Sequence, residues 1–251
     1  WATEDNYGNT PRHSLQGLFR RWMPQTLADA DTRLTVLKRL FKTHPKVGWD
    51  LCLLQLRRDD VGTYNHKPRW RRRATEYGEP QAVARTLTGQ VVQFVLSQIS
   101  YSTDQLLDLV KLMPRLDAKQ NLQVITLINA WYQQGQTWQA VEKVREVLRT
   151  TVILDQTVPA PLRSAAEKWY AQTISVDPVR RNLWLFEDSW SVKLEKTAED
   201  DSADDYSAQE KRLSAARLKA IEAILSTRGE AGILLLAEEA ASPRDVGYTL
   251  A

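Results

Sequence analysis

This chain of 251 residues has few of the residue types that build catalytic and metal sites. It holds one cysteine, Cys52, and three histidines, His13, His44 and His66. A single cysteine excludes an internal disulfide, and none of the histidines has another ligand residue at metal-binding spacing. We therefore predict no metal site, and the lack of paired cysteines favours a reducing, cytoplasmic compartment. Cys52 lies in an apolar run, which is typical of a small core residue rather than a nucleophile.

The signature motifs of common enzymes are also missing. The sequence contains no P-loop, no Gly-rich dinucleotide turn, no H-E-x-x-H, no C-x-x-C and no G-x-S-x-G. Carboxylate pairs such as Asp59-Asp60 and Glu238-Glu239 occur in surface-like contexts. We therefore expect that the chain is not an enzyme and that it needs no cofactor.

Long apolar runs and targeting signals are absent from the sequence. No stretch approaches the roughly 18 apolar residues of a membrane span, so we expect no membrane partner. The first residues do not resemble a signal peptide. Because the chain begins at Trp1 and ends inside a helical pattern, we expect it to be part of a longer polypeptide.

What the sequence does contain is a helical pattern with enough apolar residues, 43%, for a sizeable core. Apolar side chains recur at helical spacing, and alternating strand patterns are nearly absent. The predicted helices lie at about 11–22, 29–43, 46–56, 81–100, 104–113, 117–134, 137–150, 160–174, 206–227, 230–241 and 243–251. Along 81–100, the side chains predicted to face inward are Val83, Leu87, Val91, Phe94 and Val95.

Consecutive helices joined by short turns predict an all-α fold, arranged as an irregular α-solenoid or HEAT-like helical array. No fixed repeat period is detectable. We assign residues 1–190 to the array, 191–206 to an acidic loop, and 207–251 to a C-terminal helical segment that packs on or continues the array. The acidic residues of the loop are Glu195, Glu199, Asp200, Asp201, Asp204 and Asp205.

The connection over residues 57–80 begins with a basic and aromatic stretch, 57–73. Its candidate contact residues are Arg57, Arg58, Tyr64, Lys67, Arg69, Trp70, Arg71, Arg72 and Arg73. Arginine binds phosphate in a bidentate manner and aromatic rings stack on bases, so a nucleic-acid or nucleotide contact is one hypothesis. The hypothesis we favour is structural: Trp70 packs near the helix of Trp49, and the arginines pair with carboxylates. A net charge of +3 argues against a dedicated nucleic-acid binder.

Tryptophan is abundant, with nine residues in the chain. Most of them are expected in the core. Trp184 and Trp190 flank an acidic edge, and we predict that they form part of a surface for a protein partner.

Four stretches carry a resemblance to a known class of proteins: Trp1 to Thr26, His44 to Leu56, His66 to Arg71, and Leu213 to Ala251. They resemble an internal or C-terminal helical segment of large bacterial antiphage-defence proteins, of the STAND-like or sirtuin-like effector kind. The resemblance implies a helical scaffold or sensor region that binds a phage protein or another part of the same large protein. None of the effector or nucleotide-hydrolysing motifs is present, so no catalytic role is implied for any residue.

Overall fold

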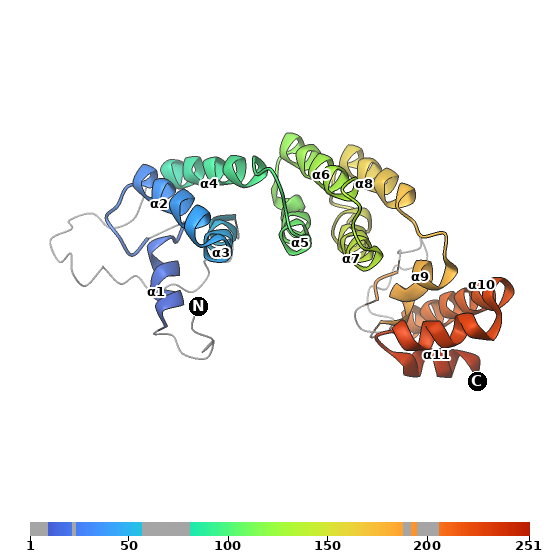
Figure 1. Ribbon diagram of the computed structural model, residues 1–251. Helices are drawn as coiled ribbons and strands as arrows, with labels where there is room; N and C mark the ends of the chain where they lie inside the picture. Colours follow the sequence, from blue (N-terminus) through green and yellow to red (C-terminus); the bar gives the residue numbers. More distant parts are fainter. Residues whose placement is uncertain (1–9, 22–23, 57–80, 188–191, 195–205) are drawn as a thin grey trace. The chain divides into compact units, whose positions relative to one another are not determined.

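The computed structural model describes residues 10–21, 24–56, 81–187, 192–194 and 206–251. These residues form helices, turns and irregular segments, with no strand among them, which confirms the all-α fold class (Figure 1). The chain divides into two compact units, Trp1–Ser102 and Thr103–Ala251. In the part that the structure describes, no helix is long and apolar enough to cross a membrane.

The N-terminal unit contains four described helices. They are α1 (Pro11–Leu18), α2 (Ala30–Thr43), α3 (Pro45–Leu56) and α4 (Gln81–Leu96). Helices α2, α3 and α4 all pack against one another. Asp29 caps α2 by accepting a hydrogen bond from the Thr32 backbone N–H at 2.8 Å, so the start of this helix follows from a local sequence signal.

The crossing of α2 and α3 depends on a close backbone approach at Gly48. A Cβ atom at this position would lie 2.3 Å from Phe41 Cα, closer than any side chain permits. Beside this crossing, the ring of Trp49 lies 6.4 Å from that of Phe41 and 6.5 Å from that of Tyr101. Trp49 and Cys52 on α3 are buried, so the interpretation of Cys52 as a core residue is confirmed.

One predicted inward position on α4 is wrong. Val83 is 37% exposed, whereas Ala84 is buried together with Leu87 and Val91. The buried residues are spaced by three and four, and Val83 falls one position away from that line. The helix is therefore rotated slightly from the prediction at its first turn.

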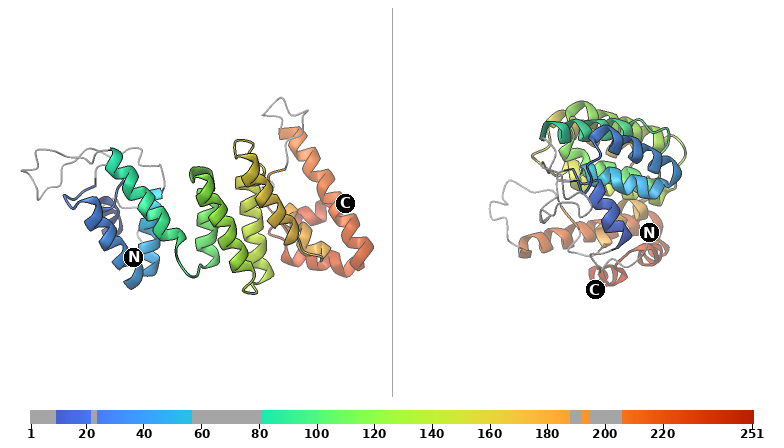
Figure 2. Two further views of the ribbon diagram at one scale, coloured as in Figure 1. Left: turned by 90° about the horizontal axis from the view of Figure 1, so that it is seen from above. Right: turned by 90° about the vertical axis from the view of Figure 1, so that its left-hand side faces the viewer.

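The C-terminal unit begins with four helices that stack in two rows. They are α5 (Thr103–Leu112), α6 (Ala118–Tyr132), α7 (Trp138–Leu148) and α8 (Ala160–Gln172). Helix α5 packs on α7, and α6 packs on α8, so each helix contacts the next but one (Figure 2). A short 3-10 turn, η1 (Met113–Arg115), follows α5, and a π-helical turn, η2 (Arg149–Ile153), follows α7. Asp117 and Gln120 form a capping box at the start of α6.

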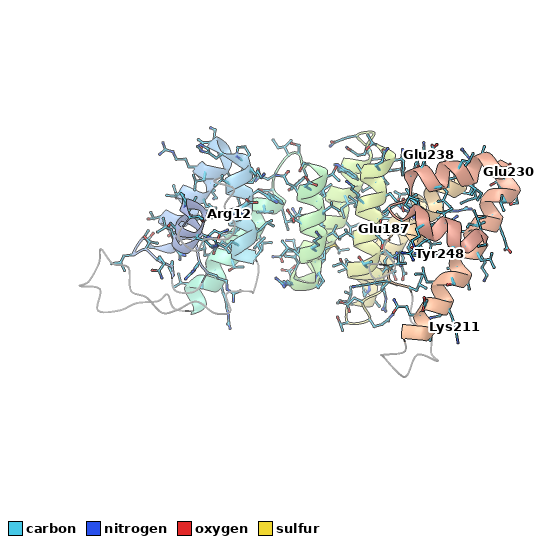
Figure 3. All side chains as sticks on the ribbon, turned by 90° about the horizontal axis from the view of Figure 1, so that it is seen from below. Arg12, Glu187, Lys211, Glu230, Glu238 and Tyr248 are labelled. Atoms are coloured by element: carbon cyan, nitrogen blue, oxygen red, sulfur yellow. The ribbon has the colours of Figure 1, made fainter. Side chains whose placement is uncertain are left out.

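The rest of this unit forms a second core around the end of the chain. Its elements are α9 (Pro178–Asn182), η3 (Leu183–Phe186), α10 (Tyr206–Glu239) and α11 (Pro243–Leu250). Gly229 interrupts α10 with φ 62° and ψ −157°, which confirms the predicted break between the helices at 206–227 and 230–241. Phe186, Ile224 and Leu236 are fully buried in this core, whereas Lys211, Glu230 and Glu238 lie on its outer surface (Figure 3).

Candidate functional site

Most of the residues predicted to contact a partner lie outside the described part of the chain. These are Arg57, Arg58, Tyr64, Lys67, Arg69, Trp70, Arg71, Arg72, Arg73 and Trp190. Trp184 is described: it is half-buried and packs against the C-terminal core. The Arg149 guanidinium carbon lies 4.0 Å from the centroid of its ring. The Arg149 side chain therefore covers one face of the Trp184 ring.

The cysteine and the two described histidines have structural surroundings. Cys52 is fully buried, and its burial raises the pKa of the thiol to about 12, so the sulfur stays protonated near neutral pH. His13 Nδ1 lies 2.8 Å from Thr10 Oγ1, and His44 is the C-cap of α2. Within the described residues, no three His, Cys, Asp or Glu side chains are placed to hold a metal ion.

A polar cluster of the C-terminal unit surrounds two buried arginines on α7 and η2. Arg145 Nη1 donates to Tyr170 O at 2.6 Å, and its Nε lies 3.2 Å from Glu142 Oε2. Arg149 binds both carboxylate oxygens of Glu146, at 2.9 and 2.8 Å, and donates to Lys193 O at 2.5 Å. Each guanidinium group thus joins its own helix to a segment distant in sequence.

A third buried arginine, Arg217, joins α10 to the segment that precedes it. Its Nε donates to Leu185 O at 2.7 Å, and Nη2 donates to Glu187 O at 3.2 Å. Nη2 also lies 2.8 Å from Asp245 Oδ2 on α11. Sequence reasoning missed all three arginines, although each occupies an apolar position of its helix; Arg217, for instance, lies four residues from both Leu213 and Ile221, which are buried.

Burial affects the carboxylates of this region. It raises the pKa of Glu142, and the nearby Arg145 opposes that rise only in part. Burial also raises the pKa of Glu187, helped by repulsion from Glu146. The guanidinium groups themselves donate to groups of this chain, so they join helices to distant segments of the unit.

A different feature of the same unit is open to a ligand. A pocket of about 240 Å³ lies where η1, the start of α6, and the loop before α8 meet. Its lining residues are Met113, Pro114, Leu116, Ala118, Asn121, Leu122, Thr157, Val158, Pro159, Pro161 and Leu162. Its volume lies between the roughly 150 Å³ of a cavity that holds benzene and the roughly 300 Å³ of the smallest drug-sized sites. It therefore suits one ring system or one large side chain.

One residue of the lining, Asn121, has a buried side-chain atom without a partner. Asn121 is 4% exposed; its Nδ2 donates to Leu116 O at 3.2 Å, while Oδ1 has no hydrogen-bond partner. Exchanging the two amide atoms would place Oδ1 against the Leu116 carbonyl oxygen, and two acceptors cannot form a hydrogen bond. The amide nitrogen therefore faces Leu116 O. A buried acceptor without a donor costs free energy, and Oδ1 has almost no accessible surface, so this cost is internal to the unit.

The chain matches no protein-family model, no curated protein and no solved structure.

Proposed function

We propose that this chain is a non-catalytic helical scaffold or sensor segment that binds a protein partner. The observation that carries the proposal is the pocket of about 240 Å³ with its largely apolar lining residues. Its floor is buried, and its mouth exposes apolar side chains, including Leu122, which is 53% exposed. An apolar surface that surrounds a small pocket is typical of protein interfaces with one buried anchor residue.

The arrangement of helices supports a scaffold of the α-solenoid or HEAT-like kind. In such arrays, alternate helices form two rows, and each pair packs on the next. The contacts of α5 with α7 and of α6 with α8 follow this pattern within the C-terminal unit. The sequence resemblance adds the proposal that the segment serves a bacterial antiphage-defence protein, with a phage protein or another part of the same protein as partner.

A capture experiment with paired variants tests the function. Proteins from infected and uninfected bacteria are captured on the immobilised chain and identified by mass spectrometry. In the test variant, Ala118→Phe, an exposed lining residue becomes large enough to fill the pocket. The control, Ala130→Phe, makes the same change at an exposed position of α6 outside the lining.

We expect a protein that binds the wild-type chain and the control but not Ala118→Phe. The chain alone should also show no nucleotide hydrolysis. A partner that binds Ala118→Phe as well as wild type would place the interface elsewhere, and clear turnover would refute a non-catalytic role. Salt-dependent capture of nucleic acid by all three proteins would instead favour the contact hypothesised for residues 57–73.

A further inference from the structure

Two half-exposed arginines of the C-terminal unit share one carboxylate, and neither belongs to the lining of the pocket. We propose that Arg180 and Arg228 together bind the carboxylate of an acidic residue that stands in an apolar segment of the protein partner. This site rests on the proposed function only in that its occupant is a protein. The geometry of the arginines, the charge that they leave over and the apolar residues beside them support it.

The carboxylate that the two arginines share is fixed by the chain itself. Asp177 is the N-cap of α9, and its Oδ1 accepts from Val179 N at 3.1 Å. Its side chain is 12% exposed, and Oδ2 lies 3.1 Å from Arg228 Nη2 and 3.7 Å from Arg180 Nε. Helix α9 packs on α10, so the two guanidinium groups come from different elements and meet at one oxygen atom.

Each arginine is held by a further contact. The guanidinium carbon of Arg180 lies 4.8 Å from the centroid of the Trp138 ring on α7. The stem of Arg228 lies against Gly232, where an added Cβ would come within 2.6 Å of Arg228 Cβ. A ligand that binds here therefore loses less free energy to side-chain ordering than it would at two unsupported surface arginines.

Both arginines keep donors for a ligand. Nε of Arg180, the nitrogen beside Asp177, is buried and takes no part in the proposed contact. The Arg180 side chain is nevertheless 41% exposed, and that of Arg228 is 45% exposed. An arginine has five N–H donors, and neither guanidinium group has another carboxylate within 4 Å in the described part of the chain.

The charges of this group do not balance. Two guanidinium groups and the Asp177 carboxylate leave one positive charge. One further carboxylate neutralises the group, whereas a phosphate monoester near neutral pH would leave an excess of negative charge beside Asp177. The planar fork of an arginine also fits a carboxylate in a bidentate manner. The charge left over therefore selects a single carboxylate as the ligand.

The neighbours of the arginines favour a carboxylate carried by an apolar peptide. Val176, which directly precedes Asp177, is 97% exposed, and Ile174 is 46% exposed. Leu225, which is 41% exposed, lies three residues before Arg228 on α10 and so on the same side of the helix. These aliphatic side chains fit apolar residues on either side of an acidic one, and they do not fit the regularly spaced charges of a nucleic acid.

Binding of short capped peptides to the full chain tests the proposal. Three peptides carry glutamate, glutamine or phosphoserine between two leucines, and a fourth carries glutamate between two serines. The ¹H–¹⁵N signals of the Trp138 indole and of Nε in Arg180 and Arg228 report on the site and give the affinities. We expect the leucine-flanked glutamate peptide to bind about fivefold more tightly than the glutamine peptide, and more tightly than the other two.

Three variants sharpen this test. Arg228→Gln removes the positive charge left over and should abolish the preference for glutamate over glutamine. The control Arg244→Gln makes the same change at an exposed position of α11 and should retain the preference. Asp177→Asn keeps a residue type that caps helices and adds one positive charge, so it should shift the preference toward the phosphoserine peptide.

Several results would overturn the proposal. They are equal binding of the glutamate and glutamine peptides, unchanged signals of the two arginines, and an undiminished preference for glutamate in Arg228→Gln. Tighter binding of the phosphoserine peptide to the wild-type chain would make phosphate the ligand. An unchanged preference in Asp177→Asn would refute selection by charge, and equal binding of the serine-flanked peptide would refute the apolar flanks.

These outcomes are distinct from those that test the proposed function. If the peptides do not bind but a captured protein is lost in Ala118→Phe, the function stands and the arginine site is wrong. If the peptides bind as expected but no protein is captured, the chemistry of the arginine site stands and the protein-binding function is wrong.

Discussion

In the N-terminal unit, the backbones of α2 and α3 approach so closely at Gly48 that a Cβ atom there would lie 2.3 Å from Phe41 Cα. In the C-terminal unit, Arg145, Arg149 and Arg217 instead reach across between elements and donate to backbone carbonyl oxygens. The first arrangement depends on shape and on the lack of a side chain. The second depends on charge-assisted hydrogen bonds, which act over longer side-chain distances.

The difference has consequences for stability. A close backbone contact is sensitive to the addition of a single methyl group but not to pH. Removal of a buried arginine side chain lowers stability strongly, because it leaves several acceptors without donors. Buried arginines also bring carboxylates such as Glu142 into the interior, where the charged form is penalised. The two units should therefore respond to different perturbations.

The largest effect is expected for Arg217→Met in the C-terminal unit. The change leaves Leu185 O, Glu187 O and the Asp245 carboxylate without this donor. Breaking a buried charged network by removing one partner costs about 3–5 kcal/mol, which urea unfolding of the variant would measure. Arg244→Met on the exposed face of α11 is the control, and it should change stability by less than about 0.5 kcal/mol. Equal losses of stability in the two variants would show that the buried hydrogen bonds of Arg217 do not stabilise the unit.

A smaller loss is expected for Gly48→Ala in the N-terminal unit. The new methyl group would overlap the α2 backbone, and overpacking of this kind costs about 1–3 kcal/mol. Gly89→Ala on α4 is the matched control, because a Cβ there meets nothing within 4 Å. It should stabilise the unit by up to about 1 kcal/mol through helix propensity. Hydrogen exchange of α2 and α3 amides distinguishes the two, and a neutral Gly48→Ala would contradict the close contact.

Asp117→Ala addresses the capping box of α6, a local signal rather than a contact between elements. Its side chain accepts from Gln120 N at 2.8 Å, and losing such a cap costs about 1 kcal/mol. The loss should appear in the exchange rates of the first turn of α6, with Asp117→Asn largely restoring it. An equal loss in Asp117→Asn would mean that the carboxylate acts by something other than capping.

The smallest expected effect is a change in the pH dependence of the C-terminal unit. Because burial raises the pKa of Glu142 above its ordinary value of 4.5, the native state binds more protons there than the unfolded state. The free energy of unfolding should therefore fall as pH rises from the ordinary pKa through the raised one. Glu142→Gln should reduce this slope in urea unfolding between about pH 4 and pH 7. An unchanged slope would assign the pH dependence to other carboxylates, such as Glu187.

The structural features that could be predicted from the sequence are those that depend on residues close together in the chain. The break between the predicted helices 206–227 and 230–241 and the place of Cys52 in the core follow from local spacing, and the structure shows both. Val83 was misplaced because helical periodicity does not define where a helix first meets its neighbours.

The pocket and the arginine network could not be predicted in the same way. The pocket is built from η1, α6 and the loop before α8, whose meeting depends on tertiary packing. Asn121 falls three residues before Val124 and seven before Ile128, on the buried side of α6, which marks a polar group in the core. Arg145 shows the same signal between Val141 and Leu148. A polar or charged residue at a buried helical position is thus a usable clue, but its partners become visible only in three dimensions.

The carbonyl groups held by Arg149 and Arg217 also affect the order in which the chain assembles during synthesis. Helices α5 to α8 emerge from the ribosome well before Lys193, the residue whose carbonyl oxygen accepts from Arg149. Leu185 and Glu187 precede their donor Arg217 by 32 and 30 residues, and Arg217 in turn precedes Asp245 by 28 residues. At a rate of about 5–20 residues per second, the last of these bonds closes seconds after the first helices have formed. The C-terminal unit therefore completes these contacts only after Asp245 has been translated.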